Sequence, residues 1–136
     1  MSRRAKLRAC AGLTSFLLLA GCSRSFPVEA SFENGRIRFD AKEKLNGCLY
    51  RFHIGAPDGE TMWSVWGYFR SNPCDDLFPI FYGVVPKGLS ERTTAKPLKE
   101  GITYRIEASD GDRYYGAFSY RRTVVIENRP EIARKP

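Results

Sequence analysis

From residue 26 onward the chain alternates between apolar and polar positions in short runs, and Gly, Asn, Asp and Pro separate these runs. A period of two predicts β-strands that bury one face, and the residues between the runs are typical of turns. The expected strands are 26–32, 36–40, 47–54, 61–69, 79–85, 102–108, 113–120 and 123–127. No segment of this part has the apolar spacing of a helix, so the pattern predicts an all-β domain.

Eight closely spaced strands favour a small β-sandwich of about 7–8 strands with Ig-like, Greek-key topology, and a small β-barrel is the alternative. The run 79–85 is apolar on both faces and is therefore expected to be a central strand. A polar connection, 86–100, follows it. Leu98, Gly101 and Tyr104 resemble the tyrosine corner of Ig-like and fibronectin-like domains, which implies a structural role for Tyr104.

An apolar stretch of eleven residues, 9–19, follows a basic segment that contains Arg3, Arg4, Lys6 and Arg8. As a helix it rises roughly 16 Å, which is too short to cross a bilayer of about 30 Å. A basic segment followed by a short apolar one is typical of a secretory signal peptide.

The next residues, Leu19-Ala20-Gly21-Cys22, resemble the lipobox of bacterial lipoproteins. The resemblance implies that residues 1–21 are removed and that Cys22 is acylated, which anchors the chain to a lipid bilayer. Residues 22–25 then form a short lipidated linker, 26–127 the β domain and 128–136 a polar tail. In enterobacterial lipoproteins, Asp at the position after the acylated cysteine keeps the protein in the inner membrane. This chain has Ser23 at that position, so the resemblance implies an anchor in the outer membrane, facing the periplasm. The alternative is an ordinary secreted protein.

Two cysteines remain once Cys10 leaves with the signal peptide and Cys22 carries lipid. In an oxidising compartment, Cys48 and Cys74 are expected to form a disulfide. It closes a loop of 27 residues, from 48 through 74, and contributes about 3.5 kcal/mol on the chain-entropy model. A metal site is the alternative, but it lacks further thiols and has a single histidine to draw on.

The net charge of +7 belongs mostly to the signal peptide, because removing its four basic residues leaves 18 − 15 = +3. A domain with so small an excess is not expected to bind nucleic acid. The composition, 43% hydrophobic and 13% aromatic, is that of one globular domain.

Few residues suggest chemistry. His53, the single histidine, lies on the polar face of its expected strand, so we predict no catalytic residue, metal or cofactor. The alternation of side chains along a strand places Trp66 and Tyr68 on the face opposite to the one that carries the expected core residues Trp63 and Val65. Exposed aromatic side chains are frequent in binding sites, so both are candidate binding residues. The alternative is that the connection 86–100 covers them.

These observations favour a non-catalytic binding or assembly module that meets an envelope protein beside its membrane. An inhibitor of lysozyme-like hydrolases is the second hypothesis. Residues 110–114 resemble the Ser-Gly-x-x-Tyr loop of membrane-bound C-type lysozyme inhibitors, with Asp110 in place of Ser. That resemblance makes Tyr114 a candidate binding residue. An envelope enzyme is the third hypothesis.

Overall fold

The computed structural model describes residues 25–43, 49–67, 78–110, 113–121 and 125–133. More than half of these residues lie in strands and only four lie in a helix, which confirms the all-β class. The strands are β1 (Ser25–Glu33), β2 (Arg36–Ala41), β3 (Arg51–Gly55), β4 (Thr61–Trp66), β5 (Ile80–Phe81), β6 (Ser90–Thr93), β7 (Tyr104–Ser109), β8 (Arg113–Arg121) and β9 (Val125–Asn128). A single helical turn, α1 (Pro130–Ala133), follows them.

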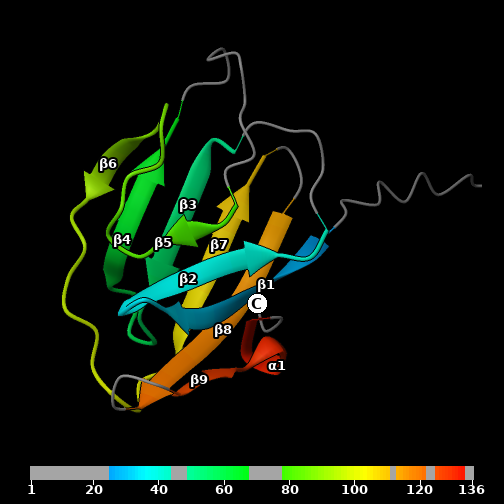
Figure 1. Cartoon of the computed structure of the whole chain (residues 1–136), viewed down its shortest axis with the longest axis vertical. Helices are drawn as coiled ribbons and strands as arrows, with labels where there is room; N and C mark the ends of the chain where they lie inside the picture. Colours follow the sequence, from blue (N-terminus) through cyan, green and yellow to red (C-terminus); the bar gives the residue numbers. More distant parts are fainter. Residues whose placement is uncertain (1–24, 44–48, 68–77, 111–112, 122–124, 134–136) are drawn as a thin grey trace, which may run out of the picture.

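The strands form one mixed sheet in the order β5-β2-β1-β8-β7-β3-β4-β6, and β9 pairs with β8 (Figure 1). The sheet curls into a half-barrel and does not divide into the two stacked sheets expected from the strand count. The reason lies in β1, whose first residues, Ser25–Pro27, pair with β8 in parallel. The remainder, Val28–Glu33, pairs with β2 antiparallel, so one bent strand continues the ladder around the curve.

Gly116 permits this bend. An ideal Cβ at that position would overlap the Val28 carbonyl oxygen of β1 and lie 2.9 Å from Ile106 Cδ1. The backbone of β1 therefore crosses β8 where β8 has no side chain, which is a common reason for glycine inside a strand.

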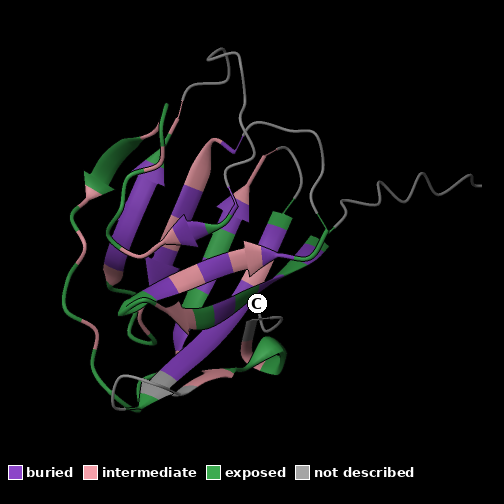
Figure 2. Ribbon diagram, in the orientation of Figure 1, coloured by how far each residue is buried: buried purple, intermediate pink, exposed green. Residues whose placement is uncertain are grey.

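The core fills the inner side of the half-barrel. Figure 2 shows buried residues alternating with more exposed ones along the strands, as the period of two predicts. Phe39 of β2 packs against Phe52 of β3 and Phe118 of β8, with ring centroids 5.2 and 5.4 Å apart. The strand β2 therefore lies across the inner face and closes the core. The largest fully buried side chains are Trp63, Tyr104, Phe39, Phe52, Phe118, Ile54, Ile80, Ile106 and Val65.

Asn128 of β9 joins the C-terminal part of the chain to β1. Its side-chain oxygen accepts a hydrogen bond from the Ala30 backbone N–H at 2.8 Å, and its side-chain nitrogen donates to the Ala30 carbonyl at 2.9 Å. The amide thus occupies both backbone groups of a buried residue, as a neighbouring strand would.

The structure differs from the expected pattern in three places. The segment 79–85 contains only the two-residue strand β5, which lies at the edge of the sheet beside β2, and Val84 and Val85 are 41% and 40% exposed. The backbone turns at Gly83, whose φ is +76°, before a longer strand can form. The polar connection contains the edge strand β6, which pairs through its backbone with β4 and so requires no apolar face. The expected tail begins in β9 and includes α1.

Candidate functional site

A basic depression lies on the outer side of β3, β7 and β8. Cross-strand pairing brings its side chains together: Arg51 stands opposite Ser109, and Ser109 stands opposite Arg113. The depression has a volume of about 420 Å³. Its polar lining residues are Tyr50, Arg51, Arg105, Glu107, Ser109, Arg113 and Tyr115.

Hydrogen bonds hold these polar groups in place. Arg51 Nη2 lies 3.3 Å from Glu107 Oε2, and Ser109 Oγ donates to the Tyr50 hydroxyl at 2.6 Å. Arg113 Nη1 donates to the Tyr115 hydroxyl at 3.3 Å. That hydrogen bond is the largest of the contributions that raise the pKa of Arg113, so its guanidinium stays charged.

The depression carries an excess of positive charge. Three arginines and one glutamate line it, and Arg105 makes no ion pair with any residue that the structure describes. Guanidinium groups bind carboxylates and phosphates through paired N–H donors, and phenol hydroxyls add further donors. The arrangement therefore suits an anionic group and offers no obvious subsite for a cation.

Trp66 lies beside this depression at the end of β4 and is 44% exposed. The guanidinium carbons of Arg51 and Arg92 each lie 5.7 Å from the centre of its indole ring, within the range of cation–π contacts. The connection 86–100 contributes Arg92 to this cluster but leaves the ring at the surface. The second aromatic candidate, Tyr68, lies outside the described residues.

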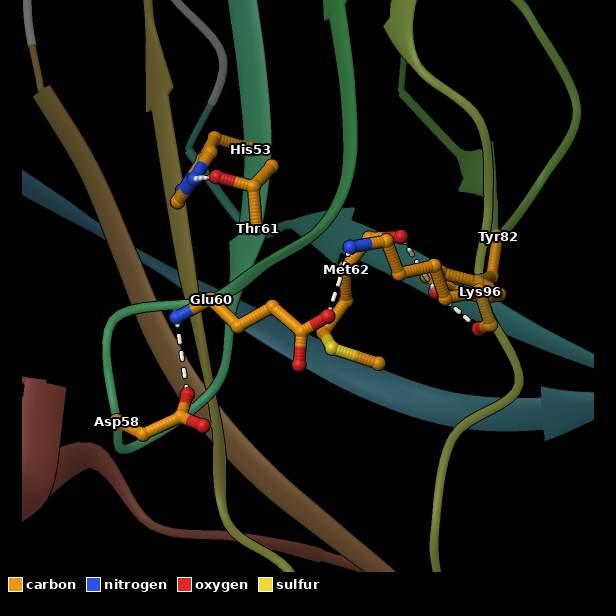
Figure 3. Close-up of polar contacts among 7 residues, drawn as sticks. All are labelled: His53, Asp58, Glu60, Thr61, Met62, Tyr82 and Lys96. Carbon is orange, nitrogen blue, oxygen red and sulfur yellow. Dashed lines mark hydrogen bonds and ion pairs between the residues drawn. The ribbon is translucent and has the colours of Figure 1, made fainter.

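His53 projects from the same outer face, two residues after Arg51 on β3 and directly opposite Glu107 of β7. Its Nε2 lies 3.0 Å from Thr61 Oγ1 (Figure 3), and its Nδ1 is buried with no hydrogen-bond partner among the described residues. Burial lowers the pKa of His53, the nearby Arg51 lowers it further, and Glu107 acts in the opposite direction. His53 is therefore neutral near pH 7 and serves as a half-buried partner of Thr61.

Tyr114 is not a surface residue. It is 2% exposed and packs against Phe26 and Phe78, each with ring centroids 5.5 Å away. Its hydroxyl donates to Asp110 Oδ2 at 2.7 Å. Because β8 turns this side chain into the core, Tyr114 cannot reach a protein partner directly, and the proposed binding role is replaced by a packing role.

The residues of the expected tyrosine corner lie together. The Tyr104 hydroxyl accepts a hydrogen bond from the Lys99 backbone N–H at 2.7 Å, and the ring is buried. Leu98 packs against the core, and Gly101 has a φ of +73°, which a residue with a side chain rarely adopts. These contacts hold the end of the connection 86–100 against the half-barrel.

A second tyrosine, which the sequence pattern did not single out, holds the middle of that connection. The Tyr82 hydroxyl donates to the Lys96 carbonyl at 2.8 Å and lies 3.2 Å from the Met62 carbonyl (Figure 3). Lys96 Nζ also forms an ion pair with Glu60 at 2.7 Å. Together these contacts hold the chain beside β4, and thereby keep β6 and its Arg92 next to Trp66.

The predicted lipidation site, Cys22, and the predicted disulfide partners, Cys48 and Cys74, lie outside the described residues. Within those residues, no three His, Cys, Asp or Glu side chains gather where they could hold a metal ion. In the same part of the chain no helix has the length and apolar character needed to cross a membrane. Comparison with known proteins found no matching family model, no similar curated protein and no similar solved structure.

Proposed function

We propose that this chain is a lipid-anchored protein of the bacterial cell envelope, in which a non-catalytic β domain binds or assembles a partner beside the membrane. The observation that carries the proposal is the Leu19-Ala20-Gly21-Cys22 motif, which ends three residues before β1 begins at Ser25. Three extended residues span roughly 10 Å. With so short a linker, an acylated Cys22 keeps the whole half-barrel close to the bilayer.

The basic depression is the proposed binding site. Arg51 and Arg113, which hydrogen bonds hold in place, support recognition of an anionic group, and Trp66 adds an aromatic surface at the edge of the depression. A hydrolase inhibitor is not favoured, because the tyrosine that suggested it is buried.

We further propose a disulfide between Cys48 and Cys74. Their nearest described neighbours, Leu49 and Phe78, are both buried in the same core cluster. Such a link would be consistent with export to an oxidising compartment and would stabilise the part of the core that contains Leu49 and Phe78. Mass spectrometry of non-reduced peptides tests it: a linked pair is expected, and two free thiols in periplasmic material would refute it.

Radiolabelled palmitate tests the anchor. We expect incorporation into the wild-type protein and into a Cys10→Ser variant, because that cysteine lies in the segment proposed to be removed. A Cys22→Ser variant should incorporate none. Equal labelling of the Cys22→Ser variant would contradict the proposal. Membrane fractionation of the labelled protein then distinguishes the outer membrane, favoured by Ser23, from the inner one.

Photo-cross-linking in intact cells tests the binding role. A photoreactive residue in place of Arg105, inside the depression, is expected to capture a discrete envelope protein or lipid. The same residue in place of Arg36, on the β1–β2 hairpin, serves as the control. Identical products from both positions would argue against a specific site. Substrate turnover by the purified protein that is lost on His53→Ala would favour an enzyme instead.

A further inference from the structure

Five residues form a row across one end of the half-barrel. Ser25 of β1 pairs with Arg113 of β8, Arg113 pairs with Ser109 of β7, Ser109 with Arg51 of β3, and Arg51 with Trp66 of β4. Cross-strand partners point to the same side of a sheet, and four strand spacings cover roughly 19 Å. Here β1, β3 and β8 begin and β4 and β7 end (Figure 1). We call this row, together with the neighbouring Arg92, the basic rim.

The basic rim combines the two side-chain types that favour a membrane interface. Arg51, Arg92 and Arg113 provide three guanidinium groups, and Glu107 forms an ion pair with Arg51 at 3.3 Å. Guanidinium groups bind phosphate through paired hydrogen bonds. Trp66 is 44% exposed, and tryptophan is enriched at the level of the lipid headgroups.

The position of the proposed anchor indicates what the basic rim binds. Ser25 belongs to the rim and follows Cys22 by three residues, so acyl chains on Cys22 hold this end of the sheet within roughly 10 Å of the bilayer. The opposite end of β1 lies eight residues further along, roughly 26 Å away. An acidic protein could approach the domain from many directions, whereas the anchored bilayer is always next to the rim.

We propose that the basic rim binds the phosphate groups of anionic phospholipids in the bilayer that holds Cys22, with Trp66 among the headgroups. This inference rests on the proposed lipid anchor and deepens it. The acyl chains supply attachment, and the rim supplies orientation: it fixes the half-barrel with this end toward the membrane. The contact is electrostatic in part, so salt weakens it.

Brominated lipids provide the test, since they quench the fluorescence of tryptophan that lies at the membrane. The acylated protein is reconstituted into vesicles of brominated phosphatidylcholine alone, or of equal parts of brominated phosphatidylcholine and brominated phosphatidylglycerol, so that the bromine content is the same in both. The contribution of Trp66 is the difference between the wild-type protein and a Trp66→Phe variant, because Trp63 is fully buried and present in both. We expect Trp66 quenching to rise at least about twofold with phosphatidylglycerol and to fall at high salt.

Charge variants identify the groups responsible. Each arginine near an anionic surface shifts the equilibrium toward the membrane-facing orientation about fivefold. The Arg51→Gln/Arg113→Gln variant should therefore lose about 25-fold in this equilibrium and show none of the quenching that phosphatidylglycerol adds. Arg36→Gln/Arg121→Gln removes the same charge from the ends of β2 and β8 that lie away from the rim, and it should leave the added quenching unchanged. Arg113→Lys, which keeps the charge, should retain most of it. An unchanged circular dichroism spectrum confirms that each variant is folded.

The results separate the rim from the anchor. Quenching that is equal in both lipids, or that survives in the Arg51→Gln/Arg113→Gln variant, overturns the rim proposal while palmitate labelling of Cys22 still supports the anchor. If the protein carries no lipid but binds phosphatidylglycerol vesicles through the rim, the anchor fails and the rim stands. A photoreactive residue at position 25 that captures a protein and no lipid in cells also overturns the proposal.

Discussion

Replacing Gly116 by alanine tests whether the bend of β1 over β8 holds the half-barrel together. The added Cβ would overlap the Val28 carbonyl oxygen and come within 2.9 Å of Ile106 Cδ1, where ordinary contacts begin near 3.4 Å. The isoleucine can change its rotamer, but the carbonyl belongs to a strand that is hydrogen-bonded on both sides. Relief therefore requires β1 to move away from β8.

The expected cost follows from that displacement. Overpacking that shifts backbone costs about 1–3 kcal/mol, and a clash with a paired strand belongs at the upper end, about 3 kcal/mol. With a denaturant dependence of about 1.5 kcal/mol per molar urea, the unfolding midpoint should fall by about 2 M. Urea unfolding of the purified protein, followed by tryptophan fluorescence, measures this change.

Two further variants make the result decisive. Gly59→Ala adds a Cβ with nothing within 4 Å at a φ of +91°, so it should cost only about 1 kcal/mol of backbone strain. Ile106→Val removes Cδ1 and should restore little stability to Gly116→Ala, because the Val28 carbonyl remains. A midpoint unchanged by Gly116→Ala, or one restored by Ile106→Val, would refute the assignment of the clash to the β1 backbone.

Three other substitutions test the contacts described above. Asn128→Ala exposes both backbone groups of Ala30 and should destabilise the protein by about 2 kcal/mol in urea unfolding, whereas a loss below about 0.5 kcal/mol would mean that water replaces the amide. Tyr104→Phe removes the hydrogen bond to the Lys99 backbone and should cost about 1 kcal/mol by the same assay; an unchanged midpoint would show that the bond contributes nothing. Because the pKa of His53 is lowered in the folded protein, its contribution to stability is complete above about pH 6.5 and is lost as the pH falls through the lower, folded value. His53→Gln should therefore lose less stability than wild type between about pH 7.5 and about pH 5, and equal losses in the two proteins would argue against this role.

Local patterns in the sequence were sufficient for the class of the fold and for much of its core. The alternation around Phe52 and Ile54 correctly separated buried from outward-facing side chains, because strand periodicity depends only on neighbours along the chain. The break between the expected strands 26–32 and 36–40 contains Asn34 and Gly35, a pair that is typical of tight hairpin turns, and both residues have positive φ in the structure. The lipobox resemblance also lies in contiguous residues, and it stays a prediction.

Tertiary structure alone decided which residues come together. The three arginines of the basic depression, Arg51, Arg105 and Arg113, lie on different strands, and only the pairing order β8-β7-β3 places them side by side. The burial of Tyr114 likewise depends on Phe26 and Phe78 from distant parts of the chain. Strand pairing joins segments that are far apart in the chain, and every strand offers similar backbone hydrogen-bonding groups. The local pattern therefore does not determine which strands pair, and so it does not determine the shape and charge of the site.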